Sequence, residues 1–108
     1  MPSDTLSLVE EALSKLAEKL RRNYGPVEVY LFGSFAKGDW LEDSDIDIIV
    51  VSEKFRGKPM PERINIVRKQ APENLAFEIL VYTPQELEEA EKRSMVIQDA
   101  TTSWRKIA

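Results

Sequence analysis

The chain has 108 residues, a formal net charge of −4 at pH 7, 43% hydrophobic residues and 31% charged residues. This composition excludes a disordered tail and favours one folded domain. The chain contains no cysteine and no histidine, which excludes disulfides, thiolate or imidazole metal sites and histidine-based catalysis, so oxygen atoms must bind any metal. No apolar run approaches the ~20 residues that span a bilayer, and the start lacks the features of a secretory signal. We therefore expect a cytoplasmic protein without a membrane segment.

The first half of the chain shows clear changes of periodicity and composition. A helical apolar rhythm comes first, then a loosely alternating strand, a glycine turn, a polar loop and a β-branched run that is typical of a central strand. These elements are predicted over residues 4–24, 27–32, 33–38, 39–44 and 46–51.

The second half continues the alternation of helices and strands. A loop, a shorter helix, a strand, a further helix and a short apolar helix are predicted over residues 52–61, 62–70, 75–82, 84–93 and 95–100. Thr83 is expected to cap the helix that starts at Pro84, because Glu86 follows three residues later. Residues 101–108 fit either a helix end or a short edge strand. No linker or repeat divides the chain, so we expect a single α/β domain over residues 1–108.

The negative charge is concentrated in one short segment. Nine consecutive residues without a basic side chain contain Asp39, Glu42, Asp43, Asp45 and Asp47. Outside this segment the chain has 15 basic and 14 acidic residues. Because proteins that bind duplexes usually carry a basic stripe, long nucleic acid is not the expected partner. The segment is either a solvated loop or a cation site.

The first predicted strand ends at a glycine turn, Gly33-Ser34. Such a turn, opening onto a helix, presents backbone N–H groups to a phosphate, and the Ser34 hydroxyl and Lys37 ammonium add donors nearby. A P-loop is excluded, since Asp39 and Trp40 stand where that motif requires Lys and Ser or Thr. The alternative is a plain turn without a ligand.

Two aspartates begin the second predicted strand. Asp45 and Asp47 are two residues apart, so their carboxylates project from the same face of the strand while Ile46 points to the other face. They either face water at the strand start or bind divalent cations. Glu78 is the only charged residue of the third predicted strand. If that strand lies beside the second, Glu78 completes a cluster of three carboxylates.

These elements together form a recognisable spacing. Gly33-Ser34, ten further residues, and then Asp45 and Asp47 give G-S-x10-D-x-D. This pattern resembles the nucleotidyltransferase superfamily of DNA polymerase beta, and most closely its small minimal nucleotidyltransferases. The runs that carry the resemblance are residues 31–38, 43–50 and 78–87, and the likeness covers nearly the whole chain.

The resemblance implies a fold and a set of site residues. The fold would be α/β (α+β), with a small mixed sheet flanked by helices. Nucleotide binding would fall to Gly33, Ser34, Lys37 and Ser44. Metal binding, of Mg²⁺ or Mn²⁺, and catalysis would fall to Asp45, Asp47 and Glu78. Glu78 stands where the family often has aspartate, and Lys37 where it often has arginine, which keeps the charge but loses the planar fork.

The resemblance also implies a reaction and a partner. The enzyme would transfer a nucleotidyl group, AMP from ATP, to an acceptor hydroxyl. The acceptor would be a HEPN-domain protein, with this chain as the antitoxin of a toxin–antitoxin pair. Two alternatives stay open: a module that neutralises its partner by contact alone, and a domain that binds nucleotide without turnover. A homodimer is a further expectation, since so small a sheet leaves an unprotected edge.

Overall fold

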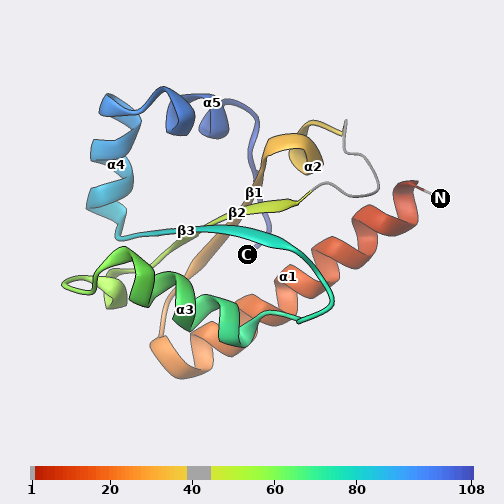
Figure 1. Ribbon diagram of the computed structural model, residues 1–108, viewed down its shortest axis with the longest axis horizontal. Coiled ribbons are helices and arrows are strands. Elements are labelled where there is room, and N and C mark those ends of the chain that lie inside the picture. The colour runs from red at the N-terminus through yellow and green to blue at the C-terminus, as the bar shows by residue number, and fades with distance from the viewer. Residues whose placement is uncertain (1, 39–44) are drawn as a thin grey trace.

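The computed structural model describes residues 2–38 and 45–108, and it contains one four-stranded sheet with helices on both faces (Figure 1). The predicted loop at 39–44, with Asp39, Glu42, Asp43 and Ser44, lies outside the described residues. The elements in chain order are α1 (Pro2–Tyr24), β1 (Glu28–Phe32), α2 (Gly33–Lys37), β2 (Ile46–Val51), η1 (Glu53–Phe55), α3 (Met60–Gln70), β3 (Phe77–Tyr82), α4 (Pro84–Arg93), α5 (Met95–Ser103) and β4 (Arg105–Lys106). No helix of the described residues is long and apolar enough to cross a membrane.

The sheet is mixed, as the family resemblance implied. Its strand order is β3-β2-β1-β4. β1 runs antiparallel to β2 and to β4, whereas β2 and β3 are parallel. The parallel pair needs a crossover, and η1 and α3 supply it. β2, buried at five of its six positions, is the central strand that its β-branched residues predicted.

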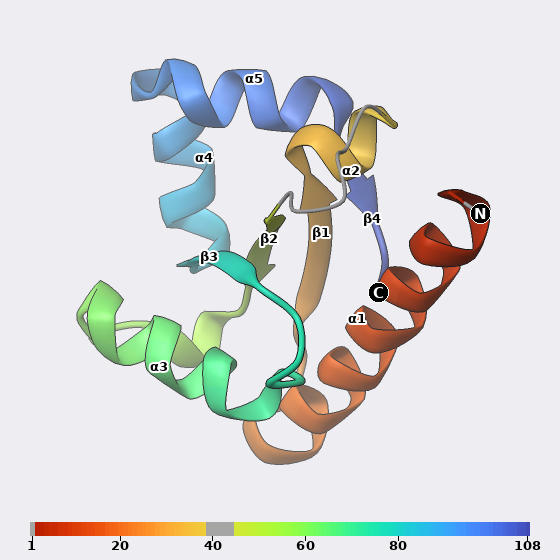
Figure 2. The same ribbon diagram turned by 45° about the vertical axis from the view of Figure 1, so that its right-hand side comes forward.

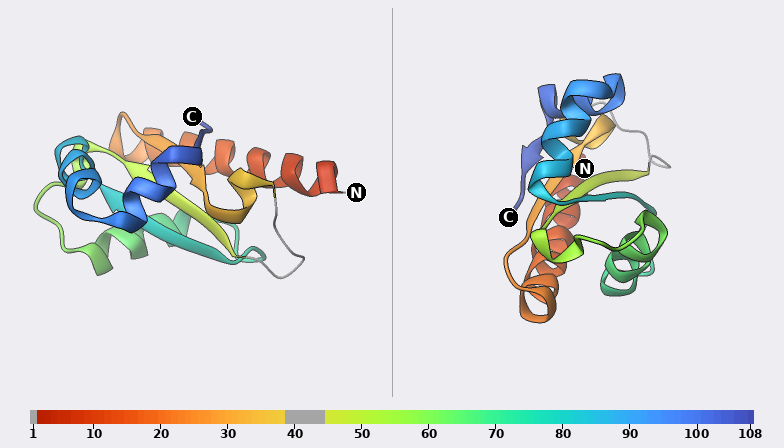
Figure 3. Two further views of the ribbon diagram at one scale, coloured as in Figure 1. Left: turned by 90° about the horizontal axis from the view of Figure 1, so that it is seen from above. Right: turned by 90° about the vertical axis from the view of Figure 1, so that its left-hand side faces the viewer.

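Two separate apolar layers cover the two faces of the sheet (Figure 3). On one face α1 and α3 pack on the sheet through buried residues that include Leu13, Leu20 and Val67. On the other face α4 and α5 cover Ile49 and Val51, mainly through Ile97 and Ala100. Strand alternation therefore sends odd-numbered β2 residues toward the α4–α5 face, and this is the face on which Asp47 lies.

The C-terminal segment resolves an ambiguity of the sequence. α5 extends to Ser103, and a strand of two residues, β4, follows and pairs with β1. Both readings of residues 101–108 were therefore partly correct. The ring of Trp104 stacks on Tyr30 with centroids 3.9 Å apart. This stacking anchors a strand that is too short to show any periodicity in the sequence.

The start of α4 shows the predicted cap and a contact that was not predicted. Glu86 N–H donates to the Thr83 hydroxyl at 3.2 Å, and Thr83 N–H donates to the Glu86 carboxylate at 2.9 Å. The same carboxylate accepts a 3.0 Å hydrogen bond from Arg63 of α3, whose side chain is only 6% exposed. Arg63 also donates to the carbonyl of Val81 at 3.1 Å. This pair joins α3, β3 and α4.

The Arg63–Glu86 pair predicts a pH-dependent stability. The hydrogen bond from Arg63 lowers the pKa of Glu86 to about 2. A lowered carboxyl pKa adds stability that is complete above the unfolded value, near 4.5, and is lost as the pH falls toward 2. We expect Glu86→Gln, which keeps the cap, to lower the free energy of unfolding by about 2 kcal/mol at pH 7. Urea unfolding at pH 7 and pH 3 measures this difference, with exposed Glu89→Gln as the control. An equal loss in both variants at pH 7 would contradict it.

Candidate functional site

The glycine turn lies where β1 ends and α2 begins. Gly33 has φ +70°, in the left-handed region that favours glycine. Ser34 follows it and is half-buried, and its carbonyl accepts the 2.9 Å hydrogen bond that closes α2 at Gly38. Figure 2 shows α2 at the end of the sheet, beside the start of β2. The predicted turn with one helical turn is therefore present.

Asp47 is packed directly against this turn. In the β1–β2 pairing Asp47 lies opposite Phe32, the residue before Gly33. A Cβ added to Gly33 would lie 2.2 Å from the Asp47 Oδ2 atom. The carboxylate therefore occupies the space that a side chain would fill. Two features require glycine here, the positive φ and the close approach of Asp47.

Glu78 lies beside Asp47 on the neighbouring strand. The parallel pairing of β2 with β3 places Asp47 opposite Glu78, and the two side chains are within hydrogen-bonding reach. Asp45 precedes Asp47 by two residues and projects from the same face. Asp45 and Glu78 are exposed, while Asp47 is half-buried. The three carboxylates thus gather at one end of the α4–α5 face, next to Gly33.

The surroundings of Asp47 disfavour its charge. Its pKa is raised to about 6, chiefly by burial and then by the hydrogen bond with Glu78 and the charges of Glu78 and Asp45. Within residues 2–38 and 45–108 no three acidic side chains are arranged to hold a metal ion. Within the gathered carboxylates, Asp47 and Glu78 are within hydrogen-bonding reach, whereas Asp45 acts on Asp47 through its charge.

The predicted basic residue of the turn has a partner on another helix. Lys37 Nζ lies 3.5 Å from Asp99 Oδ2 of α5, and both side chains are well exposed. The Lys37 charge therefore lies at the end of α2 that faces α5. Ser44, the remaining predicted nucleotide-binding residue, is outside the described residues.

A groove at the outer edge of β3 adds residues that the sequence did not single out. It has a volume of about 440 Å³ and contains Asp45 and Glu78 together with Arg68 of α3 and Val96 of α5. The helical spacing of Ile64 and Arg68 places them on one face of α3. No sequence signal indicated that this face lies beside the third strand.

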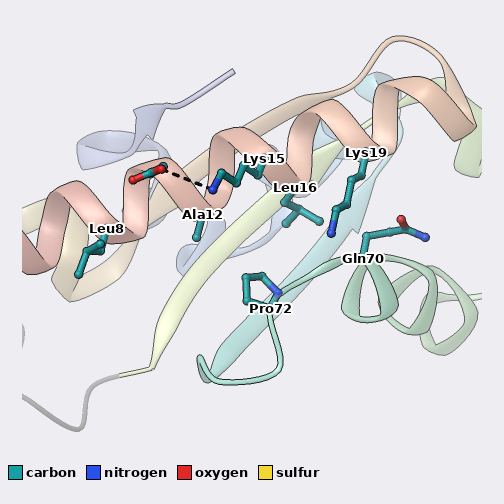
Figure 4. A pocket seen from close by; sticks show the side chains of 8 residues that line it. Leu8, Ala12, Lys15, Leu16, Lys19, Gln70 and Pro72 are labelled. Atoms are coloured by element: carbon teal, nitrogen blue, oxygen red, sulfur yellow. Dashed lines mark ion pairs between the residues drawn. The ribbon is translucent and has the colours of Figure 1, made fainter.

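A second hollow lies apart from the carboxylates, between α1 and the chain that follows α3 (Figure 4). Its volume is about 280 Å³, and Leu8, Leu16 and Pro72 supply apolar surface. Lys15 at its rim pairs with Glu11 at 3.4 Å. The hollow contains no residue of the predicted site.

Comparison with known families identifies the class of protein. Residues 13–103 match the nucleotidyltransferase domain family, and the chain belongs to that family. This family agrees with the resemblance to minimal nucleotidyltransferases that the sequence pattern indicated. A crystal structure from Sulfolobus solfataricus assigned to the nucleotidyltransferases superposes with a TM-score of 0.68 at 25% identity, covering 82% of this chain and 78% of that one. A second structure superposes with a TM-score of 0.61 at 23% identity and supports the fold.

Two individual relatives of this chain are named as protein adenylyltransferases. The protein adenylyltransferase MntA of Thermococcus cleftensis is 40% identical over 51 residues, which cover 47% of this chain and 52% of the relative. MJ1379 of Methanocaldococcus jannaschii, also named as a protein adenylyltransferase, is 46% identical over 63 residues, covering 58% and 63%. The chain spans about half the length of two of the curated relatives that it matches, MntA being one of them.

Proposed function

We propose that this protein transfers AMP from ATP to a hydroxyl group of another protein, in a metal-dependent reaction. The observation that carries the proposal is the Asp47 carboxylate packed against the Gly33 turn, with Asp45 and Glu78 on the same face. A new bond forms between the acceptor oxygen and the α-phosphorus. The bond from the α-phosphorus to the oxygen that bridges it to the β-phosphorus breaks, and pyrophosphate leaves with that electron pair.

The position of each residue suggests its proposed role. Gly33 and Ser34 would hold the β- and γ-phosphates through backbone N–H groups and a hydroxyl, and Lys37 and Ser44 would add contacts to the nucleotide. Glu78, at the open edge of the sheet, would accept the proton of the attacking hydroxyl. The protein contributes mainly by positioning the reactants and by stabilising charge that develops during transfer.

The donor atoms suit a hard divalent cation. Asp45, Asp47 and Glu78 offer carboxylate oxygens, which Mg²⁺ and Mn²⁺ prefer. Mg²⁺ is usually bound by one or two carboxylates together with substrate phosphates, so a preformed cage of three protein ligands is not required. When bound, the ion would neutralise the phosphates and the developing charge. It would also offset the charges of Glu78 and Asp45, which add to burial in raising the pKa of Asp47.

The partner is proposed from the relatives and from the resemblance. Names that designate protein adenylyltransferases support a protein acceptor. We propose a HEPN-domain protein as that acceptor, in a cytoplasmic toxin–antitoxin pair. Contact alone could also neutralise such a partner. Asp45→Ala with Asp47→Ala, compared with Glu78→Ala, separates the two functions, because neutralisation that persists unchanged in both indicates contact without transfer.

The test of the proposed function is nucleotide binding with and without metal. The carboxylates should repel a triphosphate unless a cation lies between them. We expect calorimetry to show ATP binding with Mg²⁺ that weakens at least tenfold in EDTA. Glu89→Gln, exposed on α4, should behave as the parent chain does. Equal affinity with Mg²⁺ and with EDTA would contradict the metal-dependent function.

A further inference from the structure

The hollow beside α1 has two walls (Figure 4). One wall is a stripe of α1 that consists of Leu8, Ala12, Lys15 and Lys19, and the other is formed by Gln70 and Pro72, where α3 ends. Figure 4 shows Leu8, Ala12 and Lys19 directed from α1 toward the side on which Gln70 and Pro72 lie. We call this hollow the α1 groove.

The spacing of the α1 stripe fits a second helix. Its members, Leu8, Ala12, Lys15 and Lys19, follow one another at intervals of four, three and four residues. These intervals are those of the seam along which one helix packs on another. The stripe covers about three turns of α1, or about 16 Å. A helix bound in such a groove uses residues at i, i+3, i+4 and i+7, so the occupant that this wall fits is a helix of similar length.

The end of the α1 groove nearest the N-terminus is apolar. Leu8 is 66% exposed there, although it is a large hydrophobic residue. A single exposed leucine is common on protein surfaces. This one, however, lines the groove together with the half-buried Ala12 and Pro72 and the fully buried Leu16. An apolar side chain of an occupant would therefore remove apolar surface of both chains from water here.

The other end of the α1 groove has hydrogen-bond donors without partners. Lys15 pairs with Glu11 at 3.4 Å, and the side-chain oxygen of Gln70 accepts a 3.5 Å hydrogen bond from Asn23. Within residues 2–38 and 45–108, the Lys19 ammonium and the side-chain NH₂ of Gln70 have no partner. Both groups only donate, and an ionised carboxylate only accepts. Acidic side chains of an occupant would therefore complement this end.

We propose that the α1 groove binds an amphipathic helix of a partner protein, antiparallel to α1, with acidic residues in its first turns beside Lys19 and a leucine further along beside Leu8. Acidic residues favour the first turn of a helix, because the helix N-terminus is positive. The antiparallel direction places that N-terminus at the negative C-terminal end of α1. α1 covers the sheet face opposite to that of Asp47, so the bound helix leaves the carboxylates accessible. This docking surface is additional to the proposed function.

The experiment uses two synthetic peptides as probes. Each is an alanine-rich peptide of about 20 residues, long enough to form a helix in water, with leucines on one face of its last turns. One peptide carries glutamates on that face of its first turns, and the other carries lysines at the same positions. Calorimetry should show at least tenfold tighter binding of the glutamate peptide. No nucleotide or metal is added, so the result does not depend on the proposed function.

Two variants with matched controls assign the binding to the α1 groove. Lys19→Glu should abolish the preference for the glutamate peptide, whereas Lys92→Glu, an equal change of charge at an exposed position of α4, should keep it. Leu8→Ser should weaken binding of the glutamate peptide at least fivefold. Met95→Ser, at an apolar side chain of α5 that is 83% exposed, should leave that binding unchanged. All four positions are exposed, so urea unfolding of each variant should stay close to that of the parent chain.

Three results would overturn the inference. Equal affinity for the two peptides, or no binding of either, would mean that the α1 groove does not select an acidic helix. Equal behaviour of Lys19→Glu and Lys92→Glu, or of Leu8→Ser and Met95→Ser, would place the bound peptide elsewhere on the protein. A dimer of the parent chain in sedimentation that Leu8→Ser dissociates would assign the groove to a second copy of this chain.

Discussion

Replacing Gly33 by alanine is expected to lower AMP transfer at least about 100-fold, the effect of a misplacement near 1 Å at a reacting centre. The added Cβ would lie 2.2 Å from Asp47 Oδ2, so the carboxylate must move. The nucleotide and metal are proposed to bind between the Asp47 carboxylate and the Gly33-Ser34 turn. Movement of Asp47 away from the turn would therefore disturb both. Transfer to the partner and calorimetry with Mg²⁺ and ATP measure the two losses.

A second glycine provides the control for backbone strain. Gly57 has φ +82°, and a Cβ there meets no atom within 4 Å. Gly57→Ala should cost about 1 kcal/mol of unfolding free energy from the positive φ alone, and it should leave transfer unchanged. Gly33→Ala should cost at least as much and also lose ATP binding. If the two variants lose equal stability and both bind Mg²⁺ and ATP normally, Gly33 is only a turn residue.

Most elements of the fold could be predicted because their signals are local. The β-branched run of β2 and the Thr83–Glu86 capping box each depend on neighbouring residues, and both were confirmed. α3 begins at Met60, within the predicted loop, and no side chain caps its first turn. The burial of Arg63 could not be predicted, since its partner Glu86 lies 23 residues away.

The same holds for the site: the parts that depend on neighbouring residues could be predicted, and the parts that depend on contacts distant in sequence could not. The common face of Asp45 and Asp47 follows from strand alternation alone. The position of Glu78 depends on strand order, which places β3 beside β2 in a register that puts Glu78 opposite Asp47. The contact of Asp47 with Gly33 depends on the antiparallel pairing of β1 with β2. Sequence spacing indicated that a ligand would approach Gly33 closely, but not that a carboxylate already does so.

The groove illustrates what sequence patterns omit. Its walls come from α3, β3 and α5, whose residues are adjacent only after folding. Arg68 looked like any exposed basic residue near the end of a helix, where a positive charge favours the helix dipole. In the folded chain it lines the same groove as Glu78.

Replacing Asp47 by asparagine is expected to raise stability without metal and to abolish transfer. Its pKa, raised to about 6 by burial first and then by Glu78 and Asp45, means that the folded state binds the proton more tightly than the unfolded state. Stability is therefore lost as the pH rises from about 4 through 6, and the charged form is costly at pH 7. Asparagine keeps the shape and removes that charge. We expect a gain of about 1 kcal/mol at pH 7, allowing for solvent screening of a half-buried group.

Urea unfolding and transfer assays on Asp47→Asn and the parent chain measure the expected gain in stability and the expected loss of activity. The gain of Asp47→Asn over the parent chain should shrink at pH 4, where the parent Asp47 is protonated in the folded state. Glu89→Gln removes an equal charge from an exposed position of α4 and should change neither property. Loss of transfer together with a gain in stability is expected of a residue that serves ligand binding and lowers the stability of the free protein. An Asp47→Asn variant that is less stable and still transfers AMP would make Asp47 a structural hydrogen-bonding residue, and the site would then have to be assigned elsewhere.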